Sequence, residues 1–446
     1  MPSLNNHHFD VYVTSTFDIA YALSRALDLV NPLINNHHQR VAFIAGSLAH
    51  EAGYSETETE NIIIASLIHD IGVVMEEEFN ELANSKSTSE SEFCHAIVGA
   101  QLMSCLKLFP DTPELIRYHH SPYGGEHNPI EPGKAVPEQS MVTHLADRVD
   151  VLLKRDTPSL DQKAAVIENI NRFDGIKFHP EHVKAFNRLA ERESFWFDIE
   201  EQEKYKLLKY NFRFSHLSMN IDNILETAKL LSRIIDFRCI FTANHSAGVA
   251  AVAEVIAKLM NYTEDEGKSL KVAGYLHDIG KLGIPSSILY KQGKLDEEEI
   301  QLLKKHPYFT YSILNTFQIF DKIKDWAAFH HENLDGTGYP FHMKEHKLDT
   351  GCRIMAVSDV FTALTEERPY RSSLPYDQVK SIMDDMCRNN KLDRIITELV
   401  LSNFDYVNGV RYLSQSEEMD AFKTFKNIIY NNEICTKNKR FVSTLD

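Results

Sequence analysis

Apolar residues recur along most of the chain at the spacing of an amphipathic helix. Val249, Val252, Ile256 and Met260 follow one another at three- and four-residue steps, which predicts a helix over this stretch. Two further apolar segments, 61–72 and 269–280, each end in His-Asp-Ile-Gly, and glycine is a common helix stop. The chain shows no convincing series of alternating strand patterns. We therefore predict a nearly all-α fold.

The two His-Asp segments belong to a longer internal repeat. Histidines and acids recur in one order in both halves of the chain, at a nearly fixed offset that chance rarely produces. We therefore predict a duplicated helical domain. The offsets are 207 residues from His38 to His245, 208 from His69-Asp70 to His277-Asp278, 211 from His95 to His306, 211 from His119-His120 to His330-His331, and 212 from Asp147 to Asp359.

The two copies are expected to follow each other without a flexible linker. Charged helical stretches occupy roughly residues 157–230, and this region is not rich in glycine, serine or proline. We predict two tandem helical domains, residues 1–200 with the connecting helices and residues 201–446. Helical connections would restrict the relative motion of the copies.

Composition narrows the classes of function. The 446 residues carry 47 Lys and Arg against 64 Asp and Glu, a formal charge of −17, which argues against binding a nucleic-acid polymer. A small anion can still bind where metals or a few cations supply positive charge. No apolar run has the length of a membrane span, and the start lacks a signal-peptide pattern. Six scattered cysteines without a CxxC pair indicate reduced thiols, so we expect a cytoplasmic protein.

The second half contains enough ligand-type side chains for two metal ions. An isolated His-Asp pair means little, because many such pairs are surface or capping residues. Here the pair accompanies further members of the repeat, giving five imidazoles and two carboxylates in all. One carboxylate can bridge two ions, and positions remain open for water or substrate. Mixed imidazole and carboxylate donors suit iron, manganese or zinc better than magnesium or calcium.

Three motifs in this half resemble the HD-GYP phosphodiesterases, which hydrolyse cyclic dinucleotides in bacterial second-messenger signalling. They are HDIGK at 277–281, HHENLDGTGYP at 330–340 and SDVFTALTEERPYR at 358–371. The match covers about 235–385, roughly a third of the chain, and its HHExxDGxGYP string is highly specific. An HD-GYP domain behind a degenerate HD copy is similar to bacterial phosphodiesterases acting on 3′3′-cyclic GMP-AMP. The resemblance implies a metal-dependent hydrolase of 3′3′-cGAMP, cyclic di-GMP or both.

The resemblance also implies a ligand set for two divalent ions, iron or manganese. Some family members hold a third metal through a Glu four residues before the first His, but Phe241 stands there. A hydroxide between the metals would attack phosphorus and leave a linear dinucleotide with a 5′-phosphate. The implied ligands are His245, His277, Asp278 and Asp359 for one ion, and Asp278, His306, His330 and His331 for the other.

The same resemblance implies contacts to the substrate. Lys281 would stabilise a phosphate as a point charge, and Asp278 and Lys281 are the expected catalytic residues. Arg368 and Arg371 would clamp the second phosphate, since guanidinium binds phosphate in a bidentate fork. Tyr339 would stiffen the rim of the site. A solvated lysine and two arginines in helix-surface ion pairs are the simpler alternatives.

The first half departs from the motifs in two places. Val73 stands where the second half has Lys281, and HHSPYGGEHNP at 119–129 replaces the HHExxDGxGYP string. We expect a non-catalytic domain that binds metal, binds a ligand or supports a homodimer. Whether the histidines here hold metal or are satisfied core residues stays open. The candidate set for a second metal site is His38, His69, Asp70, His95, His119, His120 and Asp147.

Two other functions remain as alternatives. A different HD-type phosphohydrolase would act on nucleotides or phosphomonoesters, but the GYP loop and RPYR segment argue against it. A non-catalytic sensor of cyclic dinucleotide or metal would be expected to carry a broken ligand set, whereas the second half keeps every ligand and Lys281.

Overall fold

The chain folds into two helical units. The computed structural model describes residues 12–29, 36–73, 89–124, 130–131, 133–238, 244–289, 291, 293–316, 320–367, 372–432 and 435. By contact the chain divides into an N-terminal unit, chiefly Thr14–Leu217, and a C-terminal unit, chiefly Ser218–Ile428. The predicted tandem all-α fold is confirmed. The predicted boundary between residues 200 and 201 stays a prediction.

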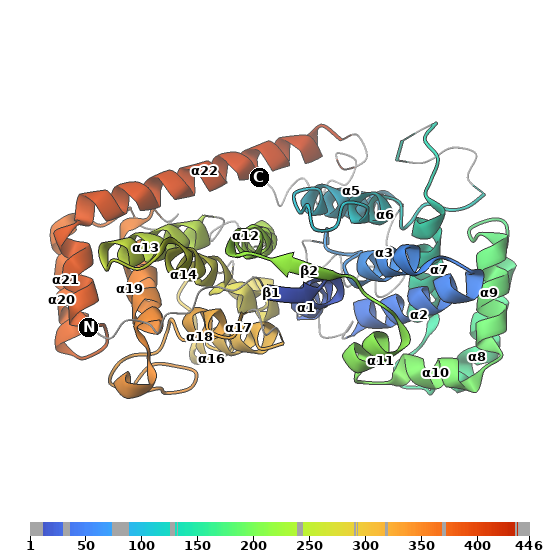
Figure 1. Cartoon of the computed structure of the whole chain (residues 1–446), viewed down its shortest axis with the longest axis horizontal. Coiled ribbons are helices and arrows are strands. Elements are labelled where there is room, and N and C mark those ends of the chain that lie inside the picture. The colour runs from blue at the N-terminus through green and yellow to red at the C-terminus, as the bar shows by residue number, and fades with distance from the viewer. Residues whose placement is uncertain are drawn as a thin grey trace. The chain divides into compact units, whose positions relative to one another are not determined.

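The N-terminal unit is built around helix α2, which packs against α3, α7 and α9 (Figure 1). Its core is apolar, with Trp196, Phe186 and Tyr118 among the largest fully buried side chains. The helices of this unit are α1 (Thr16–Asp28), α2 (His37–Ala52), α3 (Glu56–Leu67), α5 (Ser89–Met103), α6 (Thr112–Arg117), α7 (Glu138–Leu152), α8 (Ser159–Arg172), α9 (Pro180–Ala190), α10 (Glu193–Glu200) and α11 (Lys204–Asn211).

The C-terminal unit repeats this plan around helix α13, which packs against α14 and α19. Helix α17 packs on α18 and on the short 3-10 helix η3 that follows the His-Asp pair. Its helices are α12 (Ile221–Arg238), α13 (His245–Leu259), α14 (Glu264–Leu276), η3 (Ile279–Gly283), α15 (Ser286–Leu289), α16 (Glu297–Leu303), α17 (His306–Leu314), α18 (Ile323–Ala328), η5 (Glu345–Lys347), α19 (Thr350–Thr365), α20 (Tyr376–Arg388), α21 (Arg394–Ser402) and α22 (Phe404–Tyr430).

Two short strands form the one sheet found among the described residues. Strand β1 (Tyr12–Ser15) pairs with β2 (His216–Met219), where the chain passes from the first unit to the second. A two-stranded pair of this length is marginal by itself, so the helices carry the fold.

The repeat extends to the helix boundaries. Helix α3 begins with a capping box at Ser55, and α14 begins with the same box at Thr263, 208 residues later. Gly53 and Asn261, also 208 residues apart, both adopt left-handed backbone just before these caps, with φ of 87° and 60°. Each cap satisfies helix N–H groups that would otherwise lack partners. The two helices that end in the His-Asp pairs therefore start from the same local chemistry.

The glycine of each HDIG motif permits a close contact between backbones. A Cβ on Gly280 would lie 1.9 Å from the carbonyl oxygen of His306, and a Cβ on Gly72 would lie 2.0 Å from that of His95. No other residue fits at either position without moving the chain. The sequence predicted only a helix stop here, and the structure adds that these glycines bring His95 and His306 close to the His-Asp pairs.

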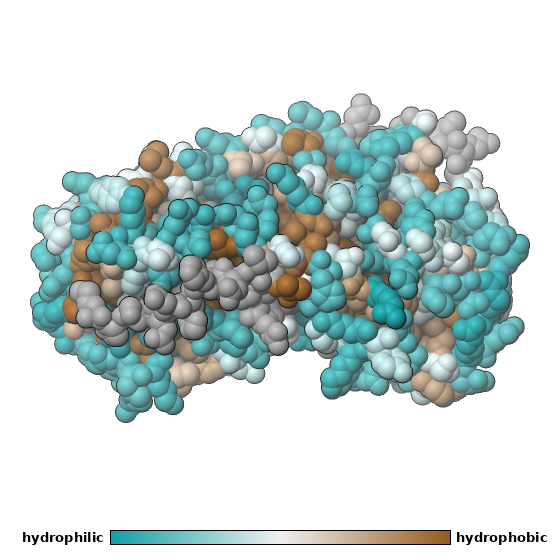
Figure 2. All heavy atoms as spheres, in the orientation of Figure 1, coloured by the Kyte–Doolittle hydropathy of each residue, from teal (hydrophilic) through white to brown (hydrophobic). Residues whose placement is uncertain are grey.

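The visible surface is mostly hydrophilic (Figure 2). Hydrophilic residues predominate on the face drawn in Figure 2, with apolar residues scattered between them. Among helices of the described residues, none is both long and apolar enough to cross a membrane.

Candidate metal centre

The ligand-type residues of the C-terminal unit stand at helix ends that meet in its core. His245 and His306 are the first residues of α13 and α17. His277 and Asp278 directly follow α14, and His330 and His331 follow α18. Asp359 lies within α19, which packs on α13. All seven predicted ligands are brought into one cluster, and their donor atoms fall into overlapping groups. The groups with atoms within 4.8 Å of one another are His245, His277 and Asp359; His277, Asp278 and His330; and His306, His330 and His331.

Asp278 lies at the centre of this cluster, with its two oxygens facing different histidines. Its Oδ2 is 3.2 Å from Nε2 of His277, and its Oδ1 is 3.4 Å from Nε2 of His306. The carboxylate is only 2% exposed. Asp359 faces Nε2 of His245 at 3.1 Å through Oδ1. A carboxylate with both oxygens among imidazoles can share its oxygens between neighbouring donor groups that could hold a metal ion.

Backbone carbonyls set the orientation of three of the imidazoles. Nδ1 of His277, His306 and His330 lies 2.7, 2.8 and 2.6 Å from the carbonyl oxygen three residues earlier in the chain. A carbonyl only accepts, so Nδ1 carries a proton and Nε2 is the ring nitrogen that faces the cluster. Metal-binding histidines are commonly held this way.

The carboxylate of Glu366 sets the orientation of His245, as the carbonyls do for those three imidazoles. Glu366 was not among the residues predicted from the sequence. Its Oε2 lies 3.0 Å from Nδ1 of His245 and also accepts a hydrogen bond from Gln415 at 3.1 Å. Its only signal in the sequence is its position in the SDVFTALTEERPYR motif. There Glu366 and Glu367 are adjacent, and nothing indicates that one of them contacts His245.

Burial and charge hold part of the cluster in its ligand form. At His245 burial would lower the pKa, but Glu366 and Asp359 outweigh it and raise that pKa to about 10. Burial lowers the pKa of His306 to about 3 and that of His330 well below its ordinary value, so both are neutral near pH 7. Burial would raise the pKa of Asp278, but the charges of His277 and Lys281 outweigh it and hold that pKa well below the usual range. Neutral imidazole and ionised carboxylate are the forms that bind metal.

Lys281 lies beside the cluster, on the side where its residues are partly exposed to solvent. Its Nζ donates a hydrogen bond to Oδ2 of Asp278 at 2.6 Å, and its side chain is 17% exposed. His331 is the most exposed ligand, with 31% of its side chain accessible, and Asp359 is 13% exposed. Solvent therefore reaches the cluster past these three residues.

The loop after His331 forms a rim on this side. The ring of Tyr339 lies 4.8 Å from that of His331, measured between centroids. Glu332 accepts hydrogen bonds from the backbone N–H of Phe341 at 2.7 Å and Met343 at 2.9 Å, which folds the loop back. Gly336 takes the left-handed backbone, with φ of 82°, that favours glycine. Of the remaining predicted residues, Arg368, Arg371 and Phe241 lie outside the described residues.

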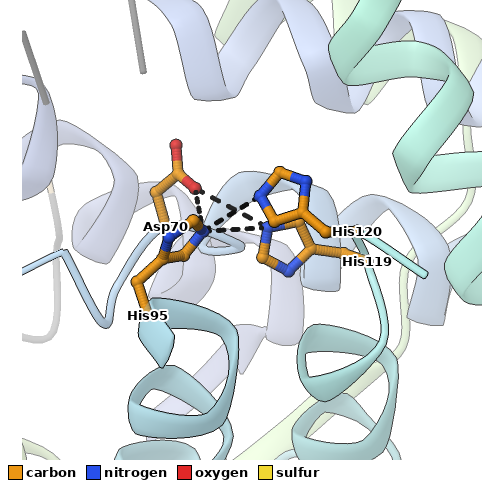
Figure 3. Close-up of side chains that lie close together, drawn as sticks. All are labelled: Asp70, His95, His119 and His120. Carbon is orange, nitrogen blue, oxygen red and sulfur yellow. Dashed lines mark hydrogen bonds and ion pairs between the residues drawn. The ribbon is translucent and has the colours of Figure 1, made fainter. Parts of the chain in front are cut away.

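The N-terminal unit holds a similar cluster around Asp70. Figure 3 shows polar atoms of Asp70, His95, His119 and His120 turned toward one another. Nε2 of His95 lies 3.3 Å from Oδ1 of Asp70 and 3.1 Å from Nε2 of His120. His69 follows the same scheme as His277, with Nδ1 2.9 Å from a carbonyl three residues earlier and Nε2 3.2 Å from Asp70.

His37 belongs to this cluster as well, and the sequence analysis missed it. Its donor atom groups with those of His69 and Asp70, and its Nε2 lies 3.4 Å from Oδ1 of Asp147. His37 is the first residue of α2, as His245 is of α13. The sequence contained a signal for His37. His37 and His245 are 208 residues apart, which is also the offset between the two His-Asp pairs, whereas His38 and His245 are 207 residues apart.

Comparison with known proteins places the chain in a family. The 3′3′-cGAMP-specific phosphodiesterase 1 of Vibrio cholerae is 32% identical to it over 395 residues, 86% of this chain and 90% of the relative. The chain belongs to the HD-GYP phosphodiesterase family. Residues 34–152 and 229–396 each match the HD domain. The predicted family and enzyme class, a hydrolase, are thereby confirmed.

Other relatives match part of the chain or its fold. The cyclic di-GMP phosphodiesterase response regulator RpfG of Xanthomonas campestris is 37% identical over 154 residues, 34% of this chain and 41% of that protein. A crystal structure of a cyclic GMP-AMP specific phosphodiesterase from V. cholerae, V-cGAP3, superposes with a TM-score of 0.62 at 21% identity. It covers 88% of this chain and 98% of that chain, so the fold of both units is shared.

Proposed function

We propose that the C-terminal unit hydrolyses cyclic dinucleotides at two divalent cations, iron or manganese, held by its His/Asp cluster. The observation that carries this proposal is the position of Asp278, whose two oxygens face imidazoles from different helices. We assign His245, His277, Asp278 and Asp359 to one cation, and Asp278, His306, His330 and His331 to the other.

The residues present suit such cations. Buried imidazoles whose Nε2 faces the cluster, together with two carboxylates, match first-row transition metals better than magnesium or calcium. When bound, the cations supply a water acidic enough to attack phosphorus at neutral pH and charge for the phosphoryl oxygens. The partly exposed side at His331 and Asp359 gives substrate a way in.

The chain's own residues orient and neutralise the substrate. Lys281, held at Asp278, would present a fixed positive charge to a non-bridging phosphate oxygen. Tyr339 would limit the sideways movement of the nucleotide from its place beside His331. Arg368 and Arg371 remain the proposed clamp for the second phosphate.

The reaction adds one water to one phosphodiester. The water oxygen forms a bond to phosphorus as the bond from phosphorus to the 3′-oxygen breaks in line. The 3′-oxygen leaves with the proton given up by the water. The product is a linear dinucleotide with one 5′-phosphate and one free 3′-hydroxyl.

Two cyclic dinucleotides are candidate substrates. The relative that matches both units is named for 3′3′-cGAMP, whereas RpfG, named for cyclic di-GMP, matches about a third of this chain. We therefore propose 3′3′-cGAMP as the preferred substrate and cyclic di-GMP as the second candidate.

The test is hydrolysis of a panel by full-length protein loaded with iron or with manganese. The panel contains 3′3′-cGAMP, cyclic di-GMP, cyclic di-AMP, mononucleotides and p-nitrophenyl phosphate. We expect turnover of cyclic dinucleotides, with Asp278→Ala inactive and low in metal. Asp70→Ala is the matched control, because it removes the corresponding carboxylate from the other unit.

Three results would contradict the proposal. Full activity of Asp278→Ala would remove this cluster from the reaction. Activity lost only in Asp70→Ala would move the reaction to the N-terminal unit. Turnover confined to mononucleotides or phosphomonoesters would favour a different HD-type phosphohydrolase.

A further inference from the structure

The N-terminal unit places one further imidazole beside its cluster, at a position where the catalytic unit has none. With His37 matched to His245, the next residue, His38, corresponds to Ser246 at the same offset of 208. His38 is fully buried, and its Nε2 points to Oδ2 of Asp70 at 3.8 Å without making a hydrogen bond. Ser246 has no imidazole, so the C-terminal unit has five imidazoles where the N-terminal unit has six.

Carboxylates outside the cluster contact Nδ1 of both His37 and His38. Asp28 lies 2.8 Å from Nδ1 of His38, and Asp150 lies 2.7 Å from Nδ1 of His37. Each carboxylate can accept the Nδ1 proton, which leaves Nε2 as the ring nitrogen that faces the cluster. Nε2 of His38 is buried and makes no hydrogen bond, and a buried polar atom in this state is costly unless something binds to it.

Distances within the cluster suit bound cations. Donor atoms around Asp70 are separated by 3.1 to 3.8 Å. Four donors placed at ~2.0–2.1 Å around a tetrahedral zinc ion lie ~3.3 Å apart. Nε2 of His95 lies 3.1 Å from Nε2 of His120, a separation at which two lone pairs would repel each other and a shared proton or a bound cation would relieve the repulsion.

The approach from solvent is also closed, in contrast to the catalytic cluster. Asp147, the counterpart of Asp359, is 4% exposed and is paired with Arg148 at 2.6 Å. Val73, buried at 2% exposure, takes the place of Lys281. Structural metal sites are saturated by protein ligands, whereas catalytic sites keep a position open for water or substrate.

We propose that the N-terminal unit holds a closed divalent transition-metal centre of its own, completed by His38, that stabilises this unit and performs no hydrolysis. Zinc and ferrous iron are the cations that its imidazole-rich donor set suits best. This centre is separate from the catalytic one and does not depend on the proposed substrate.

The test measures metal in a chain whose catalytic centre has been removed. Full-length His277→Ala/Asp278→Ala/His330→Ala protein, in which all three donor groups of the catalytic cluster are broken, is incubated with Zn²⁺, desalted, and analysed for metal per chain. We expect zinc to remain bound. Adding His95→Ala/His119→Ala should abolish it, whereas adding His182→Ala should not, because His182 is a buried histidine of the same unit that bonds Tyr54 instead.

Stability provides a second readout that separates lost metal from lost folding. With zinc at about 100 times its dissociation constant, the melting temperature of the catalytically inactive chain should rise by roughly 5–10 °C. His38→Ser, which copies Ser246, should fold but lose most of this rise, and in the otherwise intact chain should retain wild-type phosphodiesterase turnover.

The proposal is overturned if the inactive chain binds no zinc, or if its zinc survives His95→Ala/His119→Ala. If the His38→Ser variant retains its zinc and shows the full zinc-dependent rise in melting temperature, His38 is not a ligand of this centre.

Discussion

At the scale of single residues, the largest catalytic difference between the two units is Lys281 against Val73. Lys281 donates to Asp278 at 2.6 Å yet is not itself a metal ligand, so its loss should affect the reaction more than metal binding. We expect Lys281→Ala to lower kcat by about 10²-fold or more, as removal of one charged donor to a transition state does. Bound metal should stay at the wild-type level. Lys271→Ala, which removes a lysine paired with Glu254 on the surface of α14, is the control and should leave kcat unchanged.

Glu366 acts on the metal centre through His245. Its Oε2 lies 3.0 Å from Nδ1 and fixes the orientation of the ring. We expect Glu366→Gln to weaken metal binding by about 10–100-fold, the usual effect of removing a carboxylate behind a ligating histidine. A manganese titration followed by activity measures this. Glu367→Gln changes the neighbouring exposed carboxylate and should shift the titration little; equal shifts would argue that Glu366 contributes only overall charge.

At the scale of elements, the close approach of η3 and α17 assembles the catalytic cluster. Gly280→Ala would place a Cβ 1.9 Å from the carbonyl oxygen of His306 and so force these elements apart. We expect a loss of about 1–3 kcal/mol in the free energy of unfolding, together with weaker metal binding. Denaturant unfolding and metal analysis measure the two effects. Gly409→Ala, in helix α22 with no atom within 4 Å of the added Cβ, should instead stabilise by about 0.5–1 kcal/mol.

The elements also explain what could be predicted from the sequence. Helical periodicity and the 208-residue offset were enough for the duplicated all-α fold, because both depend only on spacing along the chain. Six of the seven predicted ligands of the C-terminal unit converge because they stand at or near a helix end, which sequence indicates, and Asp359 joins them from within α19. His37 was missed because a His-His pair offers two candidates, and only the helix start decides between them. Glu366 was missed because its contact to His245 spans 121 residues, which no local pattern encodes.

At the scale of the whole molecule, two units of common origin differ in how open their clusters are. Side-chain exposure reaches 31% at His331 and 13% at Asp359, against 9% at His37 and 4% at Asp147. A duplication can in this way keep one copy for chemistry, while the other loses its lysine and gains an imidazole. Each copy then serves a separate purpose without changing the helical framework.

This difference in exposure predicts the order in which a chelator removes metal. EDTA must reach a bound cation or capture one that has dissociated, and a closed site with more protein ligands releases its cation more slowly. In fully loaded protein, we expect phosphodiesterase activity to be lost in a fast phase while part of the metal stays bound. The remaining metal should leave in a slower phase that coincides with a fall in melting temperature. Sampling activity, metal per chain and melting temperature over one time course would distinguish the phases. If activity and all bound metal disappear together, the two clusters do not differ in closure.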